Sequence, residues 1–202
     1  MTCMPSPLRT GLMVAATAFA LSGCSVLSGS GPDLDTYDLS APSDISLSGS
    51  TGAQVLVTAP TSLKLLNSER IVVRTTDNEV TYLPGIRLPD TVPNVLQLKL
   101  AETFVNTGRF GGVGLPGQGL LIDYQLVSVV RAFEIRPSAG GFVARAEISA
   151  KLVNDRNGVV RDARVFASEV PAASDGRPAA QALDRAFDAV AADITQWIVS
   201  SI

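Results

Sequence analysis

The sequence predicts an α/β (α+β) fold, a single domain in which a largely antiparallel sheet is packed by two principal helices. Apolar residues recur every three to four positions in residues 91–108 and 175–202, a period typical of helices with one buried face. Residues 142–153 instead alternate with a period of two, which is typical of a strand. Hydrophobic residues make up 46% of the 202 residues and charged ones 17%, so the chain can bury a sizeable core.

The first strands are expected between residues 36 and 83. Residues 36–39 could form a short edge strand, and residues 54–60 a second strand. Residues 70–83 contain Asp77 and Asn78, both of which tolerate turn geometry, so this stretch is expected to be a hairpin. The intervening residues 40–52 are rich in Ser, Gly and Pro and are expected to be loose.

The first helix is expected over residues 91–108. Asp90 or Thr91 can cap its start, and Gly108 can end it. One face carries Val92, Leu96, Leu100 and Phe104 at every fourth position. The glycine-rich residues 109–119 then follow no strand and open no helix, so the spacing of a phosphate-binding loop is absent and a mobile loop is expected.

Three long strands are expected in the middle of the chain. In the clearest of them, one face carries Phe142, Ala144, Ala146, Ile148, Ala150 and Leu152, and the other carries Val143, Arg145, Glu147, Ser149, Lys151 and Val153. Residues 155–158 form a hairpin turn into the following strand, and residues 120–135 are expected to pair antiparallel before it. Arg145, Glu147 and Lys151 share the polar face, which predicts a solvated cross-strand charge ladder.

The C-terminal residues predict a long amphipathic helix. Its apolar stripe consists of Leu183, Phe187, Val190, Ile194, Trp197 and Ile198. Asp184, Arg185, Asp188 and Asp193 lie off this stripe. We expect the helix to pack on the sheet, and its acidic polar face argues against the alternative of a helix lying on a membrane.

The N-terminal residues 1–23 read as a signal peptide. Arg9 is followed by the uncharged apolar residues 11–21, which are too few to span a bilayer. Leu21, Ser22, Gly23 and Cys24 follow the pattern of a bacterial lipobox, which predicts cleavage between Gly23 and Cys24 and acylation of Cys24 by chains such as palmitate. The alternative is a chance cysteine in an ordinary signal peptide.

An acylated Cys24 would anchor the protein at a membrane. Several acyl chains give stable attachment, since each buried methylene contributes about 0.8 kcal/mol. Ser25 follows the cysteine, and by resemblance to bacterial lipoproteins a residue other than Asp there favours the outer membrane, facing the periplasm. Residues 24–35 are then a flexible tether, with a mean reach of about 5–6 Å × √n for n residues, and residues 36–202 the folded domain.

Composition argues against several classes of function. The chain has no histidine, so Ser-His-Asp triads and His-ligated zinc sites are impossible. Cleavage would remove Cys3 and leave only Cys24, so disulfides and cysteine metal clusters are excluded. The net charge is −3 and no basic run occurs, which argues against a nucleic-acid partner. No nucleophile has a candidate base, so we expect no catalytic residue, no metal and no cofactor.

The order of these features resembles the ABC-type transport auxiliary lipoproteins, the PqiC-like accessory subunits of MCE-protein lipid transporters. The resemblance runs through the lipobox, residues 37–39, residues 54–104, "RAFEI", "LVNDRNG" and residues 182–198. The segment "IVVRTTDNEVTYLPGIRLPD" carries most of it, although many relatives have Trp where this chain has Leu88. The resemblance implies a compact domain with a mixed sheet and two principal helices.

The resemblance also implies partners and a role. The protein would bind an MCE-domain protein and its associated ABC transporter, and dock the MCE conduit at the outer membrane during phospholipid transport. Self-association into a ring would suit a tubular partner. Two alternatives stay open: a periplasmic carrier that holds an acyl chain in an apolar cavity, and a structural lipoprotein of another envelope-assembly machine. Residues 111–119 and the polar face of the sheet are the candidate partner surfaces.

Overall fold

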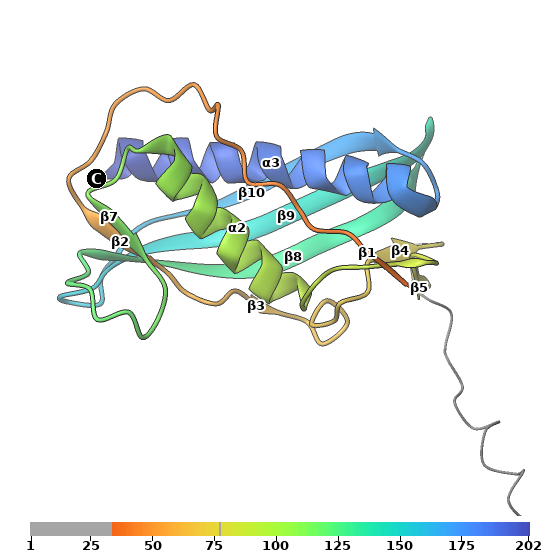
Figure 1. The fold of residues 1–202 in the computed structure, drawn as a ribbon, viewed down its shortest axis with the longest axis horizontal. Helices are drawn as coiled ribbons and strands as arrows, with labels where there is room; N and C mark the ends of the chain where they lie inside the picture. Colours follow the sequence, from red (N-terminus) through yellow and green to blue (C-terminus); the bar gives the residue numbers. More distant parts are fainter. Residues whose placement is uncertain (1–33, 77) are drawn as a thin grey trace, which may run out of the picture. The chain divides into compact units, whose positions relative to one another are not determined.

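A computed structural model describes residues 34–76 and 78–202, which form one compact unit. In this unit, helices α2 and α3 lie on the same face of an eight-stranded mixed sheet (Figure 1). The elements follow in the order β1 (Asp35–Thr36), β2 (Gln54–Val57), β3 (Thr61–Ser62), β4 (Val72–Arg74), β5 (Val80–Tyr82), β6 (Ile86–Arg87), α2 (Val92–Thr107), β7 (Gly112–Gly114), β8 (Tyr124–Ser138), β9 (Gly141–Asn154), β10 (Val160–Ala172) and α3 (Gly176–Ser201). The predicted fold class is confirmed.

Three long strands form the backbone of the sheet. β8, β9 and β10 pair antiparallel in chain order, as the two predicted turns require. The other edge of β8 is occupied by three short strands, β2, β3 and β4, which all run parallel to it. β5 adds to β4 as the predicted hairpin, β7 adds to β2, and β1 pairs with β6 in a small sheet of its own. The sheet is therefore mixed, because β8 pairs antiparallel with β9 on one edge and parallel with three short strands on the other.

Helix α2 has the boundaries that the sequence predicts. Thr91 is its N-cap residue, and the Asp90 carboxylate accepts hydrogen bonds from the Thr91 N–H and the Asn94 side chain. Gly108 ends the helix in the left-handed region, at φ 60°, which glycine adopts without strain. The predicted stripe of Val92, Leu96, Leu100 and Phe104 is fully buried.

The core lies between the helices and the sheet. The inward residues of β9 from Ala144 to Leu152 are buried, as their alternation predicts. The α3 stripe of Leu183, Phe187, Val190, Ile194, Trp197 and Ile198 packs against them, with every member at most 3% exposed. The small alanines of β9 and α3 let the helix approach the sheet closely, so α3 is a core helix.

The expectation of an irregular mobile loop over residues 109–119 is wrong at its centre. Gly112–Gly114 forms β7, an edge strand parallel to β2. A Cβ atom on Gly111 would lie 2.0 Å from the Gly52 carbonyl oxygen, so the two backbones meet at a distance that only glycine allows. This approach depends on Gly52, far away in sequence, and no local pattern reveals it.

The expectation of a loose stretch at residues 40–52 is also wrong. Its residues have no regular secondary structure, but they lie along both helices as a strap. Asn106 donates to the Ala41 carbonyl from α2, and the Ser48 N–H donates to Gln196 of α3 at 2.9 Å. The Thr51 N–H donates to the Arg109 carbonyl at 2.8 Å. Polar side chains on the helices therefore fix a segment whose composition alone suggests a linker.

Candidate functional site

The sheet face turned away from the helices is exposed, and we call it the open face. It is formed by Val127, Val129 and Arg131 of β8, by Arg145, Glu147, Ser149 and Lys151 of β9, and by Val165, Ala167 and Glu169 of β10. These side chains share a face because the register places them opposite one another, as for the row Val129, Ser149 and Val165. The predicted polar face of the sheet is thus real, and three strands contribute to it.

Charged side chains gather at one end of the open face. Arg74 of β4 makes a bidentate ion pair with Glu134 of β8, at 2.9 and 3.0 Å. On the neighbouring strands, Glu147 pairs with Arg131 at 3.0 Å and with Arg145. Arg145 also pairs with Glu169 of β10, so a continuous network links β8, β9 and β10.

The network differs from the predicted ladder in two ways. Lys151 is exposed and takes no part in it. The carboxylates of the network are also less exposed to solvent than expected. The Glu147 side chain is only 12% exposed and that of Glu134 only 6%. The bonds to Glu169 and Glu147 raise the pKa of Arg145 above its ordinary value. The three arginines and three glutamates balance, so the network itself carries no net charge.

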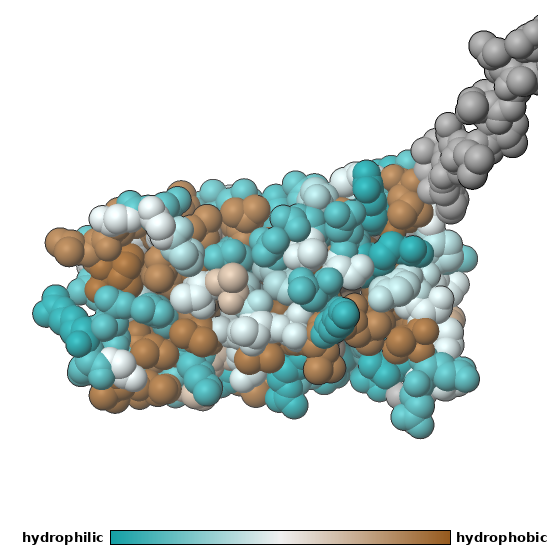
Figure 2. Space-filling view, turned by 90° about the horizontal axis from the view of Figure 1, so that it is seen from below, coloured by the Kyte–Doolittle hydropathy of each residue, from teal (hydrophilic) through white to brown (hydrophobic). Residues whose placement is uncertain are grey.

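Beyond the charge network, the open face carries exposed valines beside Ser149 and Lys151. Val127, Val129 and Val165 are each more than a third exposed, and Leu63, beside β3, is 72% exposed. Thr61, Leu63, Val129 and Arg131 line a shallow depression here, of about 400 Å³. Figure 2 shows that, on the side of the molecule it presents, hydrophobic side chains form separate patches among hydrophilic ones. Exposed apolar side chains bordered by polar ones are typical of surfaces that contact another protein.

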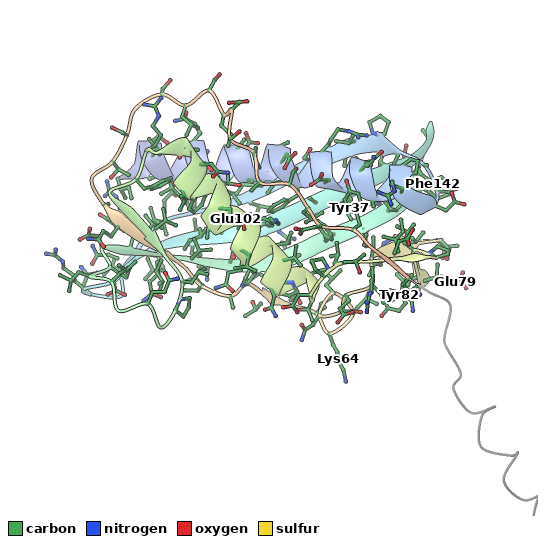
Figure 3. All side chains as sticks on the ribbon, in the orientation of Figure 1. Tyr37, Lys64, Glu79, Tyr82, Glu102 and Phe142 are labelled. Atoms are coloured by element: carbon green, nitrogen blue, oxygen red, sulfur yellow. The ribbon has the colours of Figure 1, made fainter. Side chains whose placement is uncertain are left out.

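A second apolar groove lies on the helix side. It runs between the outward flank of α2 and the glycine-rich stretch, with a volume of about 230 Å³. Its lining includes Leu98 and Val105, which are 46% and 61% exposed. Glu102 lies on the same flank of α2 (Figure 3), and Gln118 lines the groove from the loop that follows β7. The predicted partner surface at residues 111–119 therefore lies beside exposed apolar side chains.

The start of the strap meets two acidic residues of α3. The Ser40 N–H and hydroxyl donate to Asp184 at 2.8 and 3.0 Å, and the hydroxyl also lies 3.2 Å from the Asp188 carboxylate. The Tyr37 hydroxyl, which Figure 3 shows beside α3, donates to Asp184 at 3.4 Å. Burial and the nearby Asp184 charge raise the pKa of Asp188, while the bond from Ser40 lowers it. These contacts fasten the chain to the domain just after the expected tether.

Among the residues that the structure describes, no three Cys, Asp or Glu side chains are grouped so that they could hold a metal ion. No helix within those same residues is long and apolar enough to cross a membrane. The predicted cleavage and lipidation residues, Gly23 and Cys24, lie outside the described part of the chain.

A family model described as the ABC-type transport auxiliary lipoprotein component matches residues 37–195, well over half of the chain. The chain belongs to this family. The resemblance that the sequence suggests is therefore confirmed. No curated protein is significantly similar to this auxiliary lipoprotein.

Two of the similar solved structures share the fold of this auxiliary lipoprotein, and a third is more distant. Protein XCC0632 from Xanthomonas campestris, assigned to the family DUF330, is 24% identical with a TM-score of 0.73, covering 83% of this chain and 96% of that one. A protein described as uncharacterized is 17% identical with a TM-score of 0.64, covering 82% and 99%. PelC from Paraburkholderia phytofirmans, described as a dodecamer, is more distant, at 13% identity and a TM-score of 0.45, covering 75% and 92%.

Sequence reasoning named only Arg145 and Glu147 of the six residues in the charge network and missed Arg74, Arg131, Glu134 and Glu169. Arg74 lies on β4, whose parallel pairing with β8 the sequence does not show. A bulge between Val130 and Ala132 shifts the register of β8 on β9 by one residue. Because a shift of one residue exchanges the two faces of a strand, this bulge places Glu134 on the open face beside Arg145.

Proposed function

We propose that the protein is a membrane-anchored, non-catalytic accessory subunit of an MCE/ABC-type phospholipid transport system. In this proposal, acylated Cys24 holds the domain at the periplasmic side of the outer membrane. The domain binds the MCE protein and docks its conduit there. The observation that carries the proposal is the family assignment over residues 37–195, since that family is an auxiliary component of ABC-type transport.

The structure supports a binding role in two ways. The described residues offer exposed apolar surface on the open face and beside α2, next to charges that are already paired. Surfaces of this composition are typical of protein–protein contacts, whose cores are apolar and whose rims are polar. Tethering near a membrane-proximal partner raises the effective concentration, so the contact itself need not be tight.

The alternative of a periplasmic lipid carrier has less support. A carrier needs a long apolar cavity, whereas the space between the sheet and the helices of the described domain is filled by large buried side chains such as Phe104, Phe133 and Phe187. The depressions described above lie on the surface. The other alternative, a structural lipoprotein of a different envelope-assembly machine, is consistent with the same surfaces. The identity of the protein that it binds distinguishes it from the proposed function.

The test is a pull-down of the tagged, natively produced protein in mild detergent, with mass spectrometry of the proteins that accompany it. Recovery of an MCE protein with its ATPase and permease is the expected result. A chain carrying Cys24→Ala is the control. Without the acyl anchor it is not concentrated near the membrane, so it should recover less of the MCE protein. Recovery of a different envelope complex from the wild-type chain would contradict the proposal and favour the structural alternative.

A further inference from the structure

The outer edge of β10 carries no other strand of the described domain. Within residues 34–76 and 78–202, β10 is the last strand of the eight-stranded sheet and pairs with β9 alone. It is 13 residues long, and Figure 1 shows it running along the domain behind α3. No segment within residues 34–76 or 78–202 makes a main-chain hydrogen bond to this outer edge. A long free edge is a ready template for another strand.

Two observations show which residues direct their main-chain groups outward. Pro171 lies within the strand, and a proline is accepted in a sheet where its nitrogen faces away from the neighbouring strand. The Ala163 N–H is bonded to the Asp162 side chain at 2.8 Å and so does not serve the ladder with β9. Outward groups alternate along a strand, and the register is constant between these two residues. Val165, Ala167 and Glu169 therefore offer free N–H and C=O groups.

A groove lies beside this edge, on the side of α3. Arg164 and Phe166 form its wall on β10, and Asp193, Gln196 and Trp197 of α3 line the opposite side. Its volume is about 430 Å³. Its floor is rigid, since the Phe166 and Trp197 rings pack 5.3 Å apart and the Trp197 indole donates to Asp162 at 2.6 Å. An added strand would direct every second side chain into this groove.

Two arginines, Arg161 and Arg164, are exposed at the start of the edge. Asp162, between them, accepts from the Trp197 indole, and Arg161 donates to the Ser201 carbonyl, so Arg164 is the cation left to meet a bound segment. No ion pair to Arg161 or Arg164 forms among the described residues. A segment lying on this end would be favoured if it carried a carboxylate, because opposite charges placed across a strand pair attract.

We infer that β10 binds an extended segment of a partner protein as an additional strand, with an acidic side chain of that segment beside Arg164. The free N–H and C=O groups of Val165, Ala167 and Glu169 provide the ladder, since an alternating row of donors and acceptors matches the edge of another strand. The groove along α3 takes the alternate side chains of the segment. Binding of this kind combines main-chain affinity with side-chain selection. It describes how a protein segment is held, whichever envelope machine supplies that segment.

The experiment uses the complete purified chain in mild detergent as the target for a displayed library of random twelve-residue linear peptides. Enriched peptides are synthesised, their affinity is measured, and amide hydrogen exchange is followed in the presence and absence of each. We expect enriched peptides rich in β-branched residues with at least one Asp or Glu. The amides of Val165, Ala167 and Glu169 should become protected when a peptide is bound.

Two pairs of variants make the test specific. Ala167→Pro removes one outward N–H without touching the ladder to β9, and should weaken peptide binding about tenfold or more, because a lost hydrogen bond leaves its partner unsatisfied. Ala167→Ser keeps the N–H and should bind normally. Arg164→Glu should weaken binding to a similar extent, whereas Lys64→Glu, the same charge change on a side chain that projects away from the domain in Figure 3, should not. Thermal unfolding of each variant checks that it folds.

Several results would overturn the inference. Enrichment of no peptide would do so, as would peptides that protect amides elsewhere or bind Ala167→Pro and the wild-type chain equally well. Protection of β10 that rises with protein concentration alone would show that the edge pairs with a second copy of the chain. Failure of the pull-down to recover an MCE protein would leave the peptide result intact, so the inference and the proposed function fail separately.

Discussion

Individual charged residues decide the character of the open face. Glu134 is nearly buried, and it is accommodated because Arg74 places two guanidinium nitrogens against its carboxylate. A buried charge that loses its partner is costly, whereas an exposed ion pair contributes little. The small ion pair between Arg87 and Glu69, with both side chains nearly half exposed, provides the contrast.

Arg74→Met should therefore lower the free energy of unfolding by about 2–3 kcal/mol, since it leaves the Glu134 carboxylate with one charged partner fewer in a buried position. Arg87→Met, the matched control, should change it by less than about 1 kcal/mol. Urea unfolding of the two variants measures the difference. Equal effects would show that Glu134 gains its stability from other groups.

Asp188→Asn tests the acidic contact between the strap and α3. The pKa of Asp188 is raised by burial and by Asp184, so the folded state holds its proton more tightly than the unfolded state does. The carboxylate consequently costs stability once the pH rises above the ordinary value of 3.8. The asparagine can still accept from Ser40.

The Asp188→Asn variant should therefore be more stable than the wild-type chain at neutral pH. The gain should be less than about 1 kcal/mol because the side chain is partly solvated, and it should vanish in acid. Thermal unfolding across pH 3–7 follows it, and a gain independent of pH would contradict the assignment.

Single elements of the fold depend on contacts between distant segments. β7 has only three residues and is held by its pairing with β2 and by the backbone contact between Gly111 and Gly52. β8 is held on one edge by three short strands instead of one. The edge of the sheet next to α2, where the apolar groove lies, is therefore built from pieces that cannot form alone.

Gly111→Ala should open this edge. A Cβ there meets the Gly52 carbonyl at 2.0 Å, so the backbones must move apart, with a loss of about 1–3 kcal/mol. Gly140→Ala is the control, because a Cβ at that position meets nothing within 4 Å. Urea unfolding gives the stability. Amide exchange at β2 and β7 should rise in the first variant alone, and unchanged exchange would show that the strands tolerate a side chain at this contact.

The whole molecule is expected to work as a domain on a short tether. Cys24→Ala removes the thiol that the lipidation chemistry requires, so this variant should lack the mass of the acyl chains and leave the membrane fraction. The measurements are intact mass spectrometry and fractionation of cell envelopes in high salt, which removes proteins held by charge alone. A wild-type chain without the added mass would show that Cys24 is not the anchor.

The sequence by itself determined the elements whose signal is local. Helices α2 and α3, the alternation of β9 and the two hairpin turns follow from periodicity, capping and turn residues, because each of these arises from neighbours within a few positions. The tertiary structure alone decided the rest. The parallel pairing of β2, β3 and β4 with β8, the bulge that brings Glu134 onto the open face, the pinning of the strap and the formation of β7 all depend on residues far apart in the chain. The edge position of β10 belongs to the same group, since it depends on which of the described segments pair with one another in the folded sheet.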